Sequence, residues 1–182
     1  DRYIQNLLDM TRIGHGSLAV EREWIGLDEL CGAVLPRLKK LYPATDVELV
    51  LPAQLPLLHV NPSLIEQALF NILENAAKFN SPAYPIVLQV QFDSTRFCID
   101  VSDHGPGIPE QDRHRVFDMF YSVEHGDRGG GSGTGLGLAI CQGIIAAHNG
   151  RIEALAGPDG QGTTIRIMLP MSDLPFDTVR DE

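Results

Sequence analysis

Apolar residues recur at two different spacings along the chain. Over residues 1–13 and again over 27–41 they return every three or four positions, which is the spacing of one helix face. Over IVLQVQF and RFCIDV they alternate with other residues, which predicts two strands with Phe97, Ile99 and Val101 on one face. The chain therefore combines helices with paired strands.

Proline, glycine and asparagine mark the ends of the other predicted elements. Asn61 and Pro62 open a long helix through NILENAAKF, and Pro43 lies just beyond the helix before it. VELVLP and LLHVNP predict short strands, RVFDMF a short helix, GLAICQGIIAAH a longer helix that Gly150 ends, and RIEALA and TTIRIML a final strand pair. Since helices and strands do not alternate strictly, we expect an α/β two-layer sandwich with a mixed β-sheet, not a doubly wound parallel sheet.

The domain organisation follows from the same pattern. Residues 1–17 read as the end of a helix that begins upstream, residues 18–172 as one compact domain, and residues 173–182 as an acidic tail. Within the domain, residues 121–133 are poor in apolar side chains and rich in glycine. A loop of that length predicts either a functional lid or disorder.

Composition limits the classes of partner. Fourteen Lys and Arg against 24 Asp and Glu give a net charge of -10, which disfavours nucleic acid and anionic membranes, so any phosphate must be held locally. No apolar run reaches the roughly 18 residues that span a bilayer, and we expect no direct membrane binding by this chain. Cys31, Cys98 and Cys141 are odd in number and scattered, which favours buried thiols over disulfides or a zinc site.

Three polar side chains share one stripe of the long predicted helix. Asn71, Asn75 and Lys78 stand at i, i+4 and i+7, beside a separate apolar stripe. Amide oxygens can join a Mg²⁺ shell and a lysine can neutralise phosphate. Taken alone, the pattern is more typical of a solvated helix face than of a ligand site.

Two glycine-rich segments carry the other signals. DHGPGIP follows a strand, so Asp103 offers an acceptor to an amine such as that of adenine, while Gly105 and Gly107 permit close approach of the backbone. GGGSGTGLGL leads into a helix, whose first N–H groups can bind phosphate. An ordinary turn and a flexible linker are the alternatives. The second segment is no Walker A loop, because no lysine follows its last glycine.

In this order, the segments resemble the ATP-binding catalytic domain of sensor histidine kinases, in the superfamily shared with gyrase, Hsp90 and MutL. NILENAAKF resembles the N box, DHGPGIP the G1 box, VFDMFY the F box, GTGLGL the G2 box and GQGTTIRIMLP the final glycine box. The resemblance covers roughly residues 55–170. It implies a mixed sheet packed on three helices, with Mg²⁺ and ATP bound under a mobile lid.

The resemblance also implies roles for individual residues. Asn75 resembles the Mg²⁺ ligand, Asn71 and Lys78 resemble contacts near the phosphates, Phe79 an aromatic beside adenine, and Asp103 the adenine reader. Phe117 and Phe120 are expected to pack the lid. The remaining implied nucleotide contacts are Gly105, Gly107, Ile108, Arg128, Gly133, Thr134, Gly135, Leu136, Gly137, Leu138 and Thr164. Arg128 is the candidate cation near the γ-phosphate, because no basic residue follows the F box.

The resemblance implies a protein-histidine kinase that does not hydrolyse its nucleotide efficiently. Hydrolysing relatives carry a glutamate where this chain has Asn71, and an amide is no base at neutral pH; Glu74 is a conceivable base, although a surface glutamate is the commoner case. None of the six histidines has the context of a phosphoacceptor. Residues 1–17 instead resemble the end of the dimerising phosphoacceptor domain, so we expect this chain not to phosphorylate itself.

Within the family, NLLDMTRI, EREWIGLDEL and YSVEHGDR are most similar to the sensor kinases of potassium homeostasis. That similarity implies a cytoplasmic domain of a homodimeric inner-membrane protein, whose partners are its own phosphoacceptor domain and a response regulator. An anti-sigma serine kinase of the same superfamily and a non-catalytic ATP-sensing module remain as alternatives.

Overall fold

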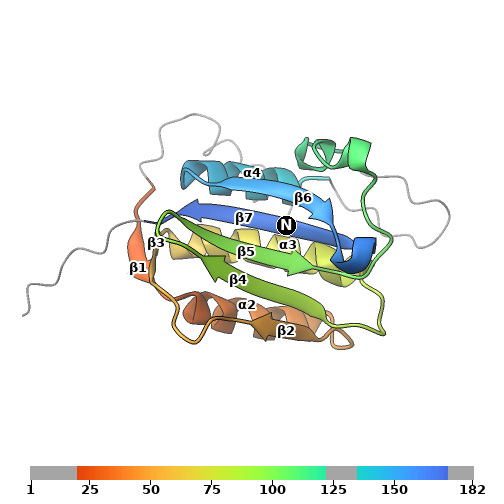
Figure 1. The fold of residues 1–182 in the computed structure, drawn as a ribbon, viewed down its shortest axis with the longest axis horizontal. Helices are drawn as coiled ribbons and strands as arrows, with labels where there is room; N and C mark the ends of the chain where they lie inside the picture. Colours follow the sequence, from red (N-terminus) through yellow and green to blue (C-terminus); the bar gives the residue numbers. More distant parts are fainter. Residues whose placement is uncertain (1–19, 122–134, 172–182) are drawn as a thin grey trace, which may run out of the picture.

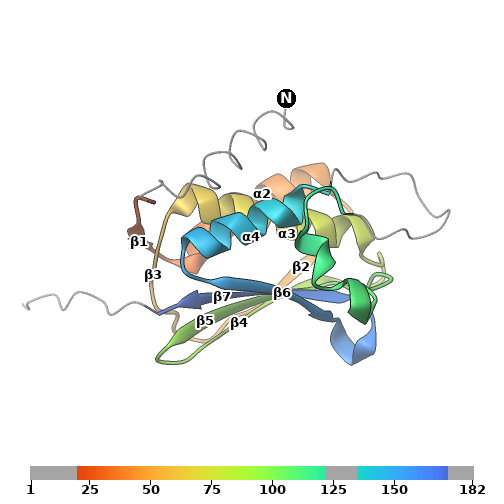
Figure 2. The same cartoon turned by 90° about the horizontal axis from the view of Figure 1, so that it is seen from above.

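The computed structural model describes residues 20–121 and 135–171 (Figure 1). A five-stranded sheet has the order β2-β4-β5-β7-β6, with β2 parallel to β4 and the other neighbours antiparallel. Its strands are β2 (Val47–Val50), β4 (Ile86–Phe92), β5 (Arg96–Ser102), β6 (Arg151–Ala156) and β7 (Thr163–Pro170). Helices α2 (Leu27–Leu41), α3 (Pro62–Phe79) and α4 (Gly137–Ala147) cover one face of it (Figure 2). The predicted sandwich of a mixed sheet on three helices is confirmed.

The core lies between the sheet and the helices. Phe97, Ile99 and Val101 of β5 are fully buried on the helix side, as their alternation predicted. Their antiparallel neighbours on β7 are Leu169, Ile167 and Ile165. The face of the sheet away from these helices carries no α-helix of the described residues (Figure 2). Each strand therefore has a core side and an outer side.

Local signals set the ends of α3. The Asn61 side chain accepts a hydrogen bond from the Leu64 N–H at 3.0 Å, and Pro62 occupies the first turn, where its missing N–H costs nothing. At the other end the N–H of Asn80 bonds to the Ala76 carbonyl. The predicted start of this helix is correct.

Several predicted boundaries are wrong in detail. Leu41 is exposed, although the periodicity placed it on the apolar face of α2. RVFDMF forms only a three-residue 3-10 turn, η2 (Arg115–Phe117). Helix α4 ends before Gly150, and Asn149 is the residue with positive φ, at 58°. A Cβ on Gly150 would lie 2.5 Å from the Met168 carbonyl, so close packing explains that glycine.

A small second sheet pairs one predicted strand with one that was not anticipated. Strand β1 (Glu23–Ile25) pairs antiparallel with β3 (Leu58–Val60), which lies in the predicted strand LLHVNP. The three residues of β1 are too few for alternation to be visible in the sequence. The pair lies at the end of the molecule where α3 begins and α4 ends (Figure 2).

Polar side chains tie that end together. The Asn61 N–H donates to Nε2 of buried His148 at 3.0 Å, while His148 Nδ1 lies 2.7 Å from the Ile144 carbonyl. Arg22 donates to the Ala147 carbonyl at 3.0 Å. Burial lowers the pKa of His148, and an Nε2 that accepts a hydrogen bond requires the neutral ring. His148 is thus structural, as expected.

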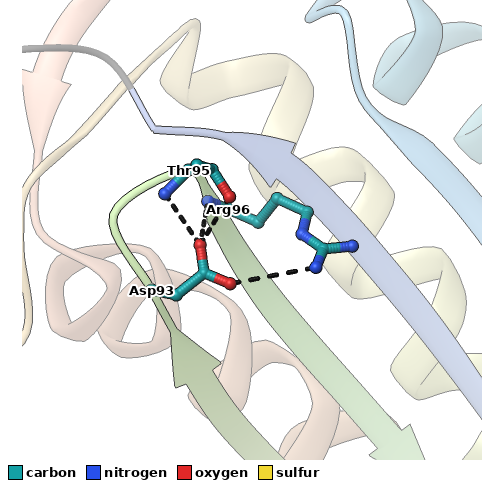
Figure 3. Close-up of polar contacts among 3 residues, drawn as sticks. All are labelled: Asp93, Thr95 and Arg96. Atoms are coloured by element: carbon teal, nitrogen blue, oxygen red, sulfur yellow. Dashed lines mark hydrogen bonds and ion pairs between the residues drawn. The ribbon is translucent and has the colours of Figure 1, made fainter.

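The β4–β5 hairpin closes through one carboxylate (Figure 3). Asp93 Oδ1 accepts from the Thr95 hydroxyl, the Thr95 N–H and the Arg96 N–H at 2.6, 2.7 and 2.9 Å. These bonds lower the pKa of Asp93, the Thr95 side chain contributing most. The turn helps to fix the register between β4 and β5. That register sets where the other end of β5, which leads into Asp103, lies in the sheet.

Candidate functional site

The predicted polar stripe of α3 lies off the sheet. Residues such as Ile65, Leu69 and Ile72 are buried toward the core, whereas Asn71 and Asn75 are half-buried and Lys78 lies on the same side, near the helix end. Helix α3 runs between α2 and α4 (Figure 2). The stripe is therefore neither core nor fully solvated.

Asn71 faces α4. Its Nδ2 atom is buried and meets no hydrogen-bond acceptor among the described residues. Burial raises the pKa of the Cys141 thiol to about 12, and the nearby Asn71 amide lowers it in part. Cys141 Sγ itself donates to the Ala68 carbonyl at 3.4 Å. A buried amide donor without an acceptor is costly unless a ligand supplies one.

Glu74 is a buried carboxylate of the same helix. Only 9% of it is exposed, and Tyr42, at the end of α2, donates to its Oε1 at 3.4 Å. Its Oε2 lies 3.8 Å from Lys78 Nζ. Its carboxylate thus contacts Tyr42 and the Lys78 ammonium, and a role of Glu74 as a base remains a prediction.

Asp103 is a buried carboxylate at the end of β5, with 7% of its surface exposed. Its Oδ1 accepts from the Gly105 N–H at 2.8 Å and the Thr163 N–H at 3.2 Å. Burial raises its pKa, and these two backbone bonds oppose the rise. Within the described chain both bonds go to Oδ1, so Oδ2 is available to a ligand.

Three glycines let the backbone close around Asp103. A Cβ on Gly105 would clash with the Phe79 carbonyl, and one on Gly107 would lie 2.9 Å from the Gly162 carbonyl. Gly107 and Gly162 have positive φ, at 79° and 72°, and a Cβ on Gly162 would clash with the Asp103 carbonyl. The G1 loop therefore touches both the end of α3 and the β6–β7 turn.

The residues beside this loop are partly accessible. Phe79 is 48% exposed at the end of α3. Ile108 packs partly buried against the core, and its carbonyl accepts from Arg113 Nε at 3.2 Å. About half of the Phe79 surface is therefore exposed next to the loop.

Two adjacent threonines open β7 beside the end of β5. Thr164 lies opposite Ser102, and their hydroxyls are 2.7 Å apart on the outer face of the sheet. Both threonines are buried, but strand alternation places Thr163 on the face of Ile165 and Thr164 on the opposite face. The role of Thr164 near the adenine remains a prediction. The sequence held both threonines, but only the register distinguishes them.

The F box meets the G2 box at Gly135. The Phe120 N–H donates to the Gly135 carbonyl at 3.0 Å, and a Cβ on Gly135 would lie 2.7 Å from Phe120 Cα. Phe117 is buried, whereas Phe120 is 70% exposed. Phe120 also has positive φ, at 63°. Whether these rings pack a lid remains a prediction, because the lid is outside the described residues.

Helix α4 begins directly after this contact. Leu136 is buried and Leu138 partly buried, while Gly137 opens the helix and no described side chain caps it. Uncapped N–H groups at a helix start favour an anion. Arg128, Gly133 and Thr134 lie outside the described residues.

These parts share one end of the molecule. The C-terminal ends of α3 and β5, the start of β7 and the start of α4 all lie on the right in Figures 1 and 2. Helices α3 and α4 pack together, and Gly105 joins the G1 loop to α3. A groove of about 760 Å³ between η2, α4 and β6 includes none of the predicted Asn, Asp or Lys residues.

This combination of fold and loops defines a class, and the comparisons agree. The family model of histidine kinase-, DNA gyrase B- and HSP90-like ATPases matches residues 60–173, and the chain belongs to that family. It is an ATP-binding domain of the kind that histidine kinases contain.

Particular relatives narrow the likeness. The chain is similar to the sensor protein KdpD of Escherichia coli K12, at 36% identity over 96% of this chain and 19% of that protein. The circadian input-output histidine kinase CikA of Synechococcus elongatus is 31% identical over 94% of this chain and 23% of its own length. The chain thus spans about a fifth of these two relatives.

Solved structures show the same fold. The mycobacterial sensor histidine kinase MprB matches with a TM-score of 0.72 and 28% identity, over 84% of this chain and 99% of that one. Full-length ShkA in complex with AMPPNP matches with a TM-score of 0.80 and 24% identity, over 94% and 35%. In the part of the chain that the structure describes, we find no helix long and apolar enough to cross a bilayer.

Proposed function

We propose that this chain binds ATP with Mg²⁺ and donates the γ-phosphoryl group to a histidine on a separate dimerisation segment, as the catalytic domain of a two-component sensor kinase. The observation that carries the proposal is the meeting of three features at one end of the fold. They are the Asn71–Asn75–Lys78 stripe of α3, buried Asp103 and the start of α4, which no side chain of the described residues caps.

Asp103 is suited to read the base. With Oδ1 held by two backbone N–H groups, Oδ2 can accept the exocyclic amine of adenine. Guanine and hypoxanthine present a carbonyl at that position, so a carboxylate would repel them. Phe79 and Thr163 are the candidate neighbours of the base.

The donor set of α3 fits a metal nucleotide. In the described chain no group of three or more His, Cys, Asp or Glu residues could hold a metal on its own. Mg²⁺ commonly takes one or two protein oxygens and completes its shell with water and phosphate, so Asn75 is the residue that would hold it. The ion would neutralise phosphate charge. Asn71 Nδ2, buried without an acceptor, suits a phosphate oxygen.

The same residues favour transfer over hydrolysis. Asn71 cannot take a proton from water, and Glu74 is hydrogen-bonded to Tyr42 on the side of α2. Phosphoryl transfer depends mainly on positioning and charge neutralisation, which the glycine loops and Lys78 can supply. A nucleotide held in this way waits for a nucleophile from another segment.

The biological setting rests on the KdpD likeness. The similarity to KdpD over 96% of this chain supports the proposal that it belongs to the cytoplasmic part of an inner-membrane sensor for potassium or osmotic signalling. Its partners would be its own phosphoacceptor domain in a homodimer and a cognate response regulator. These assignments would apply to a longer protein with the domain organisation of KdpD, of which the matched region is 19%.

Titration calorimetry of the chain with ATP, with and without Mg²⁺, tests the proposal. We expect Mg²⁺-dependent binding that weakens at least tenfold in Asn75→Ala, since removing a metal ligand or one hydrogen bond to a charged group costs about 1.5–3 kcal/mol. Gln91→Ala, on an exposed residue of β4, is the matched amide control. Equal ATP affinity in Asn75→Ala and the unaltered chain would reject the site.

Incubation with γ-labelled ATP tests whether the chain that binds ATP also contains the phosphoacceptor histidine. We expect this chain to acquire no acid-labile label by itself. A stable phosphohistidine on this chain would contradict the separate acceptor, and an acid-stable phosphoserine on a supplied protein would favour the serine-kinase alternative.

A further inference from the structure

The first residue after α3 joins two loops at the base end of the site. Asn80 Oδ1 accepts from the His104 N–H at 2.8 Å, and Asn80 Nδ2 donates to the Tyr84 carbonyl at 2.7 Å. Its own N–H continues the helix by bonding to the Ala76 carbonyl at 2.8 Å. One amide side chain thereby connects the helix end, the loop that follows it and the G1 loop.

The two loops also meet through their rings. The Tyr84 and His104 rings stack with centroids 4.6 Å apart and an interplanar angle of 18°. His104 Nδ1 is buried without a hydrogen-bond partner among the described residues, while Tyr84 is 54% exposed. The ring stack holds the His104 side chain, and the hydrogen bond to Asn80 holds the His104 backbone.

The N–H groups around Asp103 have one partner each. That of Asp103 bonds to the Thr163 carbonyl, that of His104 to Asn80 Oδ1, and that of Gly105 to Asp103 Oδ1, all at 2.8 Å. Two of these bonds hold the loop to β7 or to itself. Among the described residues, only Asn80 ties it by a side-chain hydrogen bond to α3, the helix that carries Asn75.

We infer that Asn80 is a positioning residue for base recognition: it fixes the G1 loop to α3, so that Asp103 Oδ2 lies where the adenine amine arrives. The inference rests on the proposed nucleotide function. Asn80 itself touches no nucleotide and acts through Asp103. A hydrogen-bonded carboxylate discriminates between bases only while its direction is fixed, since a loop free to move could turn it toward water.

Base preference measures this role directly. Inosine triphosphate carries a carbonyl in place of the adenine amine but the same triphosphate. In Asn80→Leu we expect the Kd for ATP to rise about tenfold and the Kd for inosine triphosphate to change less than about twofold. Calorimetry in Mg²⁺ gives both values. Gln91→Leu, the same exchange on exposed β4, is expected to leave both unchanged.

Two further variants keep the test decisive if Asn80→Leu does not fold. Asn80→Asp keeps the acceptor for His104 and loses the donor to Tyr84, and Tyr84→Leu removes the stack from a half-exposed position. In each variant we expect the ratio of the Kd for inosine triphosphate to the Kd for ATP to fall about threefold. Thermal melting confirms that the variants compared are folded.

The outcomes separate this inference from the proposed function. An unaltered chain that binds no ATP overturns both. An unaltered chain that prefers ATP, with folded variants that keep the full preference, overturns the role of Asn80 alone. Affinities for ATP and inosine triphosphate that fall in parallel also overturn it, because they indicate a general loss of structure.

Discussion

Two aspartates, one on the outer face of β5 and one directly after its last residue, differ in their partners. On the outer face, Asp100 binds the Arg166 guanidinium through both oxygens, at 2.8 and 2.7 Å. At the end of the core-facing row, Asp103 is buried, and its Oδ1 accepts from two backbone N–H groups. The first carboxylate is satisfied by the protein, whereas the second keeps acceptor capacity for a ligand.

The pKa directions reflect this difference. Burial raises the pKa of Asp103, while the hydrogen bond from Arg166 to Asp100 raises the pKa of the guanidinium. Perturbed carboxyls in water-poor surroundings are common at functional sites, whereas paired surface charges are common everywhere. The two aspartates therefore differ in burial and in the partners of their oxygens, and we expect only Asp103 to meet a ligand.

The largest expected effect on ATP affinity comes from replacing Asp103, with the same replacement of Asp100 as the comparison. Asp103→Asn keeps an acceptor for Gly105 and Thr163 but replaces the charged partner of adenine, so the Kd for ATP should rise about 100-fold, or about 2.7 kcal/mol. Asp100→Asn should change it less than about twofold. Calorimetry on both variants checks the contrast, and similar losses in the two would break it.

Acid should weaken ATP binding through the same carboxyl. Because the pKa of Asp103 is raised, its protonation on acidification begins above the usual aspartate range near 3.9, and affinity should fall there. A raised carboxyl pKa means that the folded chain holds the proton more tightly, so this protonation does not itself reduce the free energy of unfolding. Calorimetry across a pH series tests this, and Asp103→Asn should lack the transition.

The threonines of β7 sharpen the comparison at intermediate size. Thr163→Val removes a hydroxyl on the Asp103 face, and we expect about a fivefold weaker ATP affinity, equivalent to about 1 kcal/mol. Thr164→Val removes the contact to Ser102 on the outer face and should leave ATP affinity unchanged. The reverse order of effects would mean that Thr164 reaches the nucleotide.

The smallest effect concerns stability alone. The Asp100–Arg166 pair has a guanidinium about one-third exposed, and such pairs contribute about 1 kcal/mol or less. A double-mutant cycle with Asp100→Asn and Arg166→Gln, followed by urea unfolding, should give a coupling of that size. A coupling near zero would mean that the outer pair adds nothing to the sheet.

Local spacing predicted much of this site. The stripe on α3 depends only on helical periodicity, and Asp103 on its place after an alternating strand, so both could be read from neighbouring residues. The fold class followed from the order of elements, and the family from the order of the glycine segments. The roles of Asn75, Lys78 and the lid residues remain predictions.

Contacts between distant segments were out of reach of the sequence. Tyr42 meets Glu74 across 32 positions, and Asn80 meets His104 across 24. Neither contact produces a periodic pattern in the sequence, because each depends on how helices, strands and loops pack together.

The sequence by itself determined which residues can do chemistry and on which elements they stand, since helix and strand geometry relate neighbours by fixed rotations. Only the tertiary structure decided which of them meet. Strand register placed Thr163 and Thr164 on opposite faces of β7, and packing of the helices brought Glu74 into contact with Tyr42 at the end of α2. A shift of one residue reverses the face of a strand side chain, and that register is set by pairing along the whole sheet.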